Sequence, residues 1–215
     1  MIETSGKSIL FDPFISPNPL ASSIDVNTIS PDYMLLSHGH EDHIADAPAI
    51  AQRSNCTVVA IWELAAWMVD KGATHTHGMN IGGTWNFDFG RVKMVQAIHS
   101  STLPDGNSAG NAAGFVVQNE VDCFYYAGDT ALYSDMALIP KRFKLKTAFL
   151  PIGSNFTMDI EDAIDAAKIL GVTHVIGMHY DTFGFIVINH EDAIAAFANA
   201  GITLELMKIG STITI

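Results

Sequence analysis

The sequence predicts an α/β protein in which two mixed β-sheets face each other and carry helices on their outer faces. Three observations indicate this class. A short apolar strand, a polar cluster and a helix follow one another near the N-terminus, two hairpins occupy the middle of the chain, and two helix-then-strand units end it. Antiparallel hairpins and helix-linked strands in one chain are typical of mixed sheets with helices packed on them.

The first third of the chain alternates apolar strands with helices. Strands are expected over 7–11, 33–36 and 57–61, and helices over 44–53 and 63–70, the second ending at Gly72. The segment 14–31 is rich in proline, serine and asparagine, so an irregular loop is expected there. A second loop is expected over 72–83, which contains His75, His77 and two adjacent glycines.

The middle of the chain reads as two hairpins. The first joins strands 84–89 and 92–98 at Gly90, and the second joins strands 113–118 and 123–127. The small and polar residues of 100–111 lack periodicity, as is common in a lid over an active site. A helix over 133–139 and a strand over 147–150 follow.

Two similar helix-then-strand units complete the chain. Asp159 and Asn189 are good helix N-caps, acidic residues follow each of them, and a glycine ends each helix before strands 173–178 and 203–206. Residues of the first unit recur in the second at an offset of thirty positions, among them Glu161, Asp162, Ala163, Ile164, Gly171 and Thr173. Either shared capping chemistry or an internal duplication explains the match, and we favour shared capping chemistry.

Composition and charge narrow the possible functions. With 215 residues, 48% of them hydrophobic, the chain is expected to form a single domain, 1–215, with a substantial core. A net charge of −12 disfavours nucleic acid and anionic membranes as partners. The two cysteines, Cys56 and Cys123, suggest no disulfide framework, and with no signal-peptide core the protein is expected to be cytoplasmic.

The polar cluster from His38 to His43 is the main chemical feature of the sequence. It holds His38, His40 and His43 together with Glu41 and Asp42, directly after the strand 33–36. Neutral imidazole and carboxylate are natural ligands of Zn²⁺ and of harder first-row metals. These ligands are too many for one tetrahedral metal that also holds a water, so they suit two metals.

Three more candidate ligands stand where other predicted strands end. His99 follows 92–98, Asp129 follows 123–127 across one glycine, and His179 follows 173–178. Carboxyl ends of strands converge on one edge of a sheet, so these residues are expected to meet the first cluster. His174, at the other end of its strand, and His190, beside a helix cap, are interpreted as structural.

Together these motifs resemble the metallo-β-lactamase superfamily. The segments that carry the resemblance are His38-Gly39-His40-Glu41-Asp42-His43, His99, Gly128-Asp129-Thr130 and His179. Further segments resemble a branch of small metal-dependent hydrolases similar to L-ascorbate-6-phosphate lactonase: Ile9-Leu10-Phe11-Asp12-Pro13-Phe14, Met79-Asn80-Ile81-Gly82-Gly83, Pro151-Ile152-Gly153, Asn155-Phe156-Thr157-Met158 and Met178-His179-Tyr180. The resemblance implies a four-layer αβ/βα sandwich. It also implies that a first strand of that branch is missing before Ile2.

The resemblance further implies a ligand set for two divalent metal ions. His38, His40 and His99 would hold one metal, Asp42, His43 and His179 the other, and Asp129 would bridge the two. Zinc is the expected metal, with manganese, iron or nickel as alternatives.

Other roles remain open at this stage. Asp42 is also expected to orient the attacking hydroxide. Asp12 either fixes a ligand imidazole or forms the turn before Pro13. Asn155 and Tyr180 either contact the substrate or pack within their loops.

The expected function is metal-dependent hydrolysis of a small ester, lactone or phosphodiester by a hydroxide that bridges two metals. An aspartate rather than a cysteine at position 129 points away from zinc β-lactamases that use a cysteine ligand. The alternative is a non-catalytic metal-binding or sensor protein of the same fold. The expected partner is a small-molecule substrate, without nucleic acid or membrane, and a homo-oligomer is possible.

Overall fold

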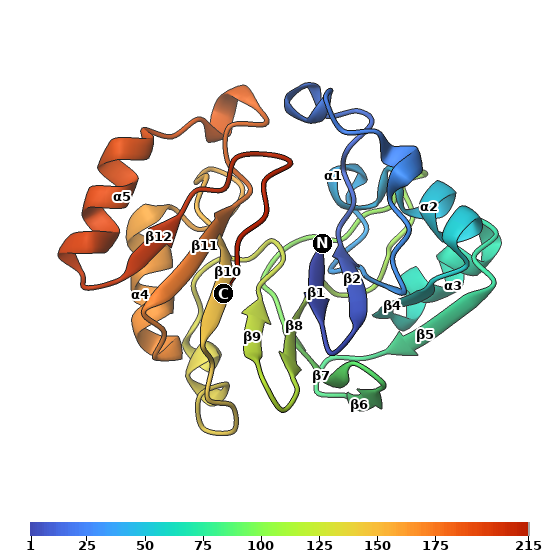
Figure 1. The fold of residues 1–215 in the computed structure, drawn as a ribbon, viewed down its shortest axis with the longest axis horizontal. Helices are drawn as coiled ribbons and strands as arrows, with labels where there is room; N and C mark the ends of the chain where they lie inside the picture. Colours follow the sequence, from blue (N-terminus) through green and yellow to red (C-terminus); the bar gives the residue numbers. More distant parts are fainter. Residues whose placement is uncertain (215) are drawn as a thin grey trace.

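The apolar strands assemble into two β-sheets that face each other in this computed structural model, which describes residues 1–214 (Figure 1). The first sheet has the order β1-β2-β3-β4-β5, with bounds β1 Ile2–Thr4, β2 Lys7–Phe11, β3 Tyr33–Leu35, β4 Thr57–Ile61 and β5 His75–Met79. Only the β1/β2 pair is antiparallel, so the sheet is mixed.

The second sheet combines the hairpins with the last helix-linked strands. Its order is β12-β11-β10-β9-β8-β7-β6, with bounds β6 Thr84–Phe87, β7 Gly90–Gln96, β8 Ala113–Gln118, β9 Cys123–Tyr126, β10 Thr147–Pro151, β11 His174–Met178 and β12 Thr203–Glu205. Strands β6 to β9 pair antiparallel, whereas β9 to β12 pair parallel. The mixed character predicted for both sheets is therefore confirmed.

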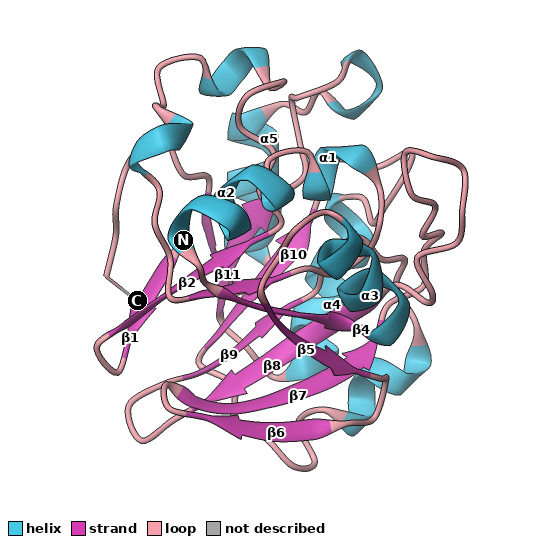
Figure 2. Ribbon diagram, turned by 90° about the vertical axis from the view of Figure 1, so that its right-hand side faces the viewer, coloured by secondary structure: helices cyan, strands magenta, loops and turns pink. Residues whose placement is uncertain are grey.

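Helices cover the outer face of each sheet, as predicted (Figures 1 and 2). On the first sheet lie α2 (Ala47–Ser54) and α3 (Trp62–Asp70), and on the second lie α4 (Ile160–Leu170) and α5 (His190–Asn199). The short helix α1 (Glu41–Ile44) follows β3 near the top of Figure 1. Short 3-10 helices form at η1 (Pro19–Ala21), η2 (Val26–Thr28), η3 (Ser134–Leu138) and η4 (Gly184–Ile186). The architecture is the four-layer αβ/βα sandwich.

Side-chain alternation along the central strands divides the core into two clusters. In β8, Phe115 and Val117 belong to the cluster that includes the first sheet, whereas Val116 belongs to the cluster under α4 and α5. In β9, Phe124 and Tyr125 divide in the same way. Because successive strand residues point to opposite faces, these apolar strands are buried on both sides.

Four sequence expectations need correction. The segment 72–83 is not a loop throughout, because β5 pairs with β4 over its whole length. The helix expected over 44–53 begins only at Ala47, as α2 with Pro48 in its first turn, and Ile44 instead ends the separate short helix α1. The helix expected over 133–139 is the 3-10 helix η3, and β1 was not predicted.

The fold brings several strand ends to one place. In the first sheet β2 and β3 run parallel, and in the second β9, β10 and β11 run parallel. The residues that follow these strands therefore gather at one edge of the sandwich. Within residues 1–214, no helix has both the length and the apolar character that a membrane crossing needs.

Candidate metal centre

The loops after five strands bring imidazoles and carboxylates together at this edge. Asp12 follows β2, the cluster from His38 to His43 follows β3, and His99 follows β7. Asp129 follows β9 and His179 follows β11. The seven residues expected as metal ligands fall into two groups, each compact enough to hold a metal ion: His38, His40 and His99, and Asp42, His43, Asp129 and His179.

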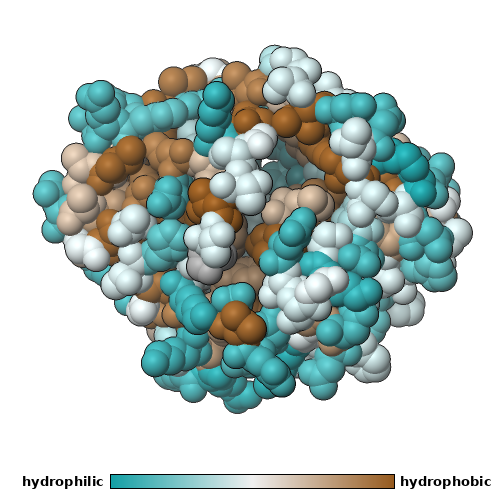
Figure 3. Space-filling view, viewed as in Figure 1, coloured by the Kyte–Doolittle hydropathy of each residue, from teal (hydrophilic) through white to brown (hydrophobic). Residues whose placement is uncertain are grey.

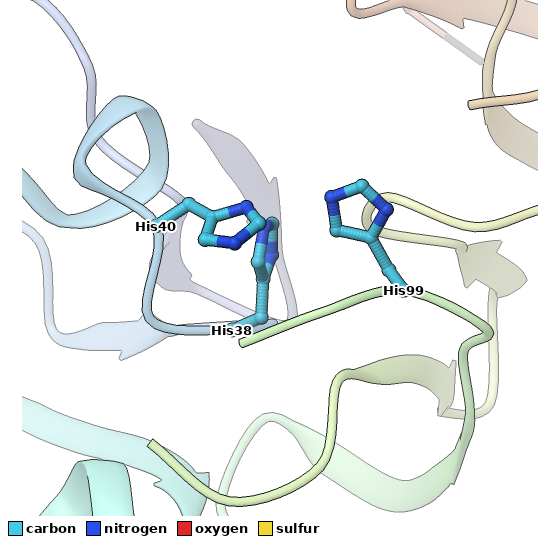
Figure 4. Close-up of side chains that lie close together, drawn as sticks. All are labelled: His38, His40 and His99. Carbon is cyan, nitrogen blue, oxygen red and sulfur yellow. The ribbon is translucent and has the colours of Figure 1, made fainter. Parts of the chain in front are cut away.

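The first group consists of three imidazoles from two loops (Figure 4). His38 and His40 lie close together, with Nε2 of His38 3.0 Å from Nδ1 of His40, and the ring of His99 faces them. The other nitrogen of His40, Nε2, lies 3.2 Å from Oγ of Ser100. These rings can offer three nitrogen donors to one ion, the number that catalytic zinc sites of the three-histidine type use.

The second group adds carboxylates to imidazoles. Oδ2 of Asp42 lies 3.5 Å from Nε2 of His179 and 3.7 Å from Nε2 of His43. Asp42 and His43 come from the first turn of α1, whereas His179 has a left-handed backbone with φ of 56°. This backbone turn follows β11 and directs the ring back into the site.

Asp129 occupies the centre of the whole cluster. Its Oδ2 lies 3.0 Å from Nε2 of His179, 3.3 Å from His43, 3.5 Å from His99 and 4.0 Å from His38. The carboxylate therefore touches members of both groups, as a bridging ligand would.

The backbone before Asp129 requires glycine. Gly128 has φ of 61°, and a Cβ atom there would lie 2.7 Å from Cβ of Ser37. A side chain would strain this turn and press on the loop that carries His38.

Asp12 positions two of the candidate ligands, His43 through a direct hydrogen bond and His38 through Ser37. Its carboxylate accepts hydrogen bonds from the backbone N–H of Ser37 (2.7 Å), the Ser37 hydroxyl (2.6 Å), Nδ1 of His43 (3.0 Å) and the Tyr126 hydroxyl (3.0 Å). This is the first of the two roles considered for Asp12 from the sequence, although the residue also stands at a turn with φ of 40°.

These contacts also select the ring tautomers. The single proton of the Ser37 hydroxyl goes to Asp12, so its oxygen must accept from Nδ1–H of His38 at 2.9 Å. His43 likewise donates through Nδ1 to Asp12. Once unprotonated, rings held in this way present the lone pair of Nε2 to the cluster, which is the arrangement that metal-ligating histidines require.

Unpartnered polar atoms show that the donor set fits a cation. Nε2 of His43 and Oδ1 of Asp129 are buried and have no hydrogen-bond partner among the described residues. Buried polar atoms are nearly always paired, so such atoms call for a ligand. A divalent cation would satisfy both of them.

The first group is neutral in the absence of metal. Burial lowers the pKa of His38 well below its usual value, and the neighbouring His43 lowers it further. Burial also lowers the pKa values of His40 and His99. Their lone pairs are therefore free near neutral pH, since metal binding requires the unprotonated ring.

The second group is strongly charged. Burial opposes ionisation of Asp129, but His43 and His179 outweigh it and hold the pKa of Asp129 well below its usual value. Burial also opposes protonation of His179, yet hydrogen bonds to Asp129 and Asp42 raise its pKa to about 9. For His43, Asp129 and Asp12 outweigh burial and raise the pKa well above its usual value. The carboxylates thus attract positive charge to this position.

A cavity of about 900 Å³ opens beside the cluster. His40, Asp42, His99, Asp129 and His179 form part of its wall.

The two residues considered for substrate contact are not among its lining residues. Asn155 and Tyr180 lie in adjacent loops, and Tyr180 packs partly buried against the core under α4 and α5. Phe156 and Phe183, one and three positions away from them, line the cavity instead. Sequence reasoning missed these aromatic residues, although the repeated phenylalanines after His179 were a usable signal.

Known proteins resemble this chain along most of its length. A family model described as beta-lactamase superfamily domain matches residues 7–180. A UPF0173 metal-dependent hydrolase of Flavobacterium johnsoniae is 51% identical over 212 residues, which cover 99% of this chain and 94% of that protein. A UPF0173 metal-dependent hydrolase of Methylacidiphilum infernorum is 46% identical over 208 residues, which cover 97% of this chain and 92% of that protein. The solved structure of Igni18, described as a novel metallo hydrolase from Ignicoccus hospitalis, is 33% identical in sequence and has a TM-score of 0.87. The match covers 98% of this chain and 91% of that one.

Proposed function

The chain belongs to the metallo-β-lactamase superfamily, and on that basis we propose that it hydrolyses a small ester, lactone or phosphodiester with two divalent metal ions. Its relatives carry the name metal-dependent hydrolase, which supports an enzyme of that class. The observation that carries the proposal is the convergence of seven histidine and aspartate side chains into two groups that share Asp129 as a neighbour.

The two groups divide the ligands between two sites. His38, His40 and His99 would hold one ion, Asp42, His43 and His179 the other, and Asp129 would contact both. Divalent cations at such sites act as Lewis acids and lower the pKa of a water molecule toward neutrality. Zinc suits a donor set of imidazole and carboxylate, and manganese, iron and nickel bind the same donors.

The chain itself supplies orientation and charge. Asp12 and Ser37 keep the rings of His38 and His43 in the tautomer that turns Nε2 inward. Asp42 and Asp129 both line the cavity, but the side chain of Asp42 is the more exposed, at 24% against 3%. Its oxygen can accept a hydrogen bond from water that enters from the cavity, and so orient that water toward a bound carbonyl carbon or phosphorus.

Turnover by metal-loaded protein tests this function. The substrates are p-nitrophenyl acetate, γ-butyrolactone and bis(p-nitrophenyl) phosphate, measured before and after removal of metal with a chelator. We expect chelation and His40→Ala to abolish turnover, and Asp42→Ala to lower kcat about 100-fold or more. His75→Ala and Asp70→Ala, which change exposed residues outside the cluster, serve as matched controls and should keep full activity.

Two outcomes would contradict the proposal. Turnover that persists without metal would show that the cluster does not perform the chemistry. Stoichiometric metal without turnover of any member of the panel would favour the alternative, a non-catalytic metal-binding or sensor protein.

A further inference from the structure

The cavity beside the metal centre has an apolar wall. Its lining includes five apolar residues outside the cluster, Phe14, Pro17, Phe156, Phe183 and Phe185. A volume of about 900 Å³ is far larger than an acetyl group or a butyrolactone ring needs, and is of the size that holds a drug-sized ligand. The cavity therefore has room for a part of a ligand that the cluster does not contact.

Both halves of the sandwich contribute to this wall. Phe14 follows β2 of the first sheet, and its ring centroid lies 6.2 Å from that of Phe183, which follows β11 of the second sheet. The ring of Phe156 lies 6.4 Å from that of Phe185. Figure 3 shows hydrophobic side chains around a hollow between the two halves, near the top of the view.

The aromatic rings of the wall are unusually accessible. Phe185 is 78% exposed, Phe156 is 49% exposed and Phe183 is 37% exposed. Exposed aromatic side chains that gather around a concave site mark a binding surface, because a ligand removes their apolar area from water.

The charged residues of the cavity do not favour an anionic group away from the metals. Glu41, Asp42 and Asp129 line the cavity, and no lysine or arginine lies among its lining residues. A phosphate or carboxylate remote from the metal centre would lack the basic partner that such groups normally receive.

The loop that carries Phe183 and Phe185 is fixed at its base. Asp181 accepts a hydrogen bond from the backbone N–H of Ile188 at 3.1 Å, and its other oxygen lies 2.6 Å from Nε2 of His190. Its own N–H donates to the carbonyl of Ile186 at 2.9 Å. These contacts close the segment 181–188 into a compact loop and hold its two rings over the cavity.

We infer that the substrate is an ester or lactone that carries an uncharged aromatic or medium-length aliphatic group, bound by the phenylalanine wall. The inference rests on the proposed function for the reacting bond and adds the chemical class of the group beside it. Phe185 and its neighbours set specificity through contact with that group, whereas Asp181 is a positioning residue.

Paired esters test the specificity on metal-loaded protein. We expect p-nitrophenyl 4-phenylbutyrate to show a kcat/KM at least about tenfold above that of p-nitrophenyl acetate, after division by the hydroxide-catalysed rate of each ester. Phe185→Ala should raise KM for the phenylbutyrate ester about tenfold and so lower the ratio of its kcat/KM to that of the acetate. Phe185→Leu should recover part of the loss. Leu138→Ala, at an exposed residue that does not line the cavity, should change neither ester.

A binding measurement keeps the inference separate from the proposed function. 4-Phenylbutyramide and butyramide are uncharged amides whose binding is followed by NMR on the metal-loaded protein, whether or not any ester turns over. We expect the phenyl compound to bind at least tenfold more tightly, and Phe185→Ala and Asp181→Ala to weaken it. Asp181→Asn, which keeps the acceptor for Ile188, should weaken it less than Asp181→Ala.

Different failures have different meanings. If no ester, lactone or phosphodiester of either panel is hydrolysed but the phenyl amide binds through Phe185, the proposed function is wrong and the apolar site stands. If the two amides bind equally, or if Phe185→Ala leaves binding unchanged, the apolar site is wrong. Sedimentation gives a further outcome. If the protein forms a dimer that Phe185→Ala dissociates, and amide binding is unchanged, the rings belong to a self-association surface and the inference is wrong.

Discussion

At the scale of single residues, Asp12 forms the hydrogen bonds that orient two of the candidate ligands. One carboxylate reaches the loop of His38 through Ser37, contacts His43 directly and accepts from Tyr126 across the sheet interface. A carboxylate that accepts a hydrogen bond from the second ring nitrogen of a metal-ligating histidine fixes the ring tautomer and raises the basicity of the ligand. The arrangement therefore predicts an effect on metal affinity from a residue that need not touch the metal.

The first prediction concerns this residue. Asp12→Ala should weaken metal binding about 10- to 100-fold, because His38 and His43 lose the group that orients them. Competition with a chelator of known affinity measures the dissociation constant. Asp25→Ala, which removes an exposed carboxylate that caps η2, is the control. An unchanged metal affinity in Asp12→Ala would show that the network does not position the ligands.

The sequence identified the residues of the cluster because each follows an apolar strand. His99, Asp129 and His179 could be named before the fold was known, since strand ends converge on one edge. The repeated phenylalanines after His179 were a signal for the phenylalanine wall, but their place around the cavity could not be predicted. Phe156, Phe183 and Phe185 lie in loops whose course depends on contacts such as those of Asp181. For the same reason, Asn155 and Tyr180, the residues considered for substrate contact, are only near neighbours in sequence of the residues that line the cavity.

At the scale of elements, the strands that present the cluster were predictable, whereas β1 and β5, the edge strands of the first sheet, were not. The predicted strands 7–11 and 57–61 agree with β2 and β4 at both ends. Strand β5 reads His-Thr-His-Gly-Met, a segment without apolar alternation, so its strand character comes from pairing with β4. Tertiary pairing overrides local propensity there.

Helix caps give a prediction at this scale. The side chain of Asp159 accepts a hydrogen bond from the backbone N–H of Asp162 at 2.9 Å and so caps α4. Asp159→Ala should lower the free energy of unfolding by about 1 kcal/mol, measured by urea denaturation. Asp165→Ala, which removes only an exposed ion pair with Lys168, should cost less. Equal losses in the two variants would mean that the cap does not stabilise α4.

At the scale of the whole molecule, the candidate metal centre is a product of the sandwich. The cluster from His38 to His43 belongs to the first sheet, whereas His99, Asp129 and His179 follow strands of the second. Neither sheet alone supplies a complete group. The apolar core between β3 and β9 must therefore form before the two sets of ligands can meet, and bound metal should in turn stabilise the assembled sandwich.

The number of metal ions per chain tests this arrangement most directly. Elemental analysis of protein loaded with zinc and freed of excess metal should give two ions per chain, and His179→Ala should retain fewer. Two ions are expected because the cluster forms two groups of donors that share Asp129 as a neighbour. A count of one ion or none in the unmodified protein would contradict the two-metal centre.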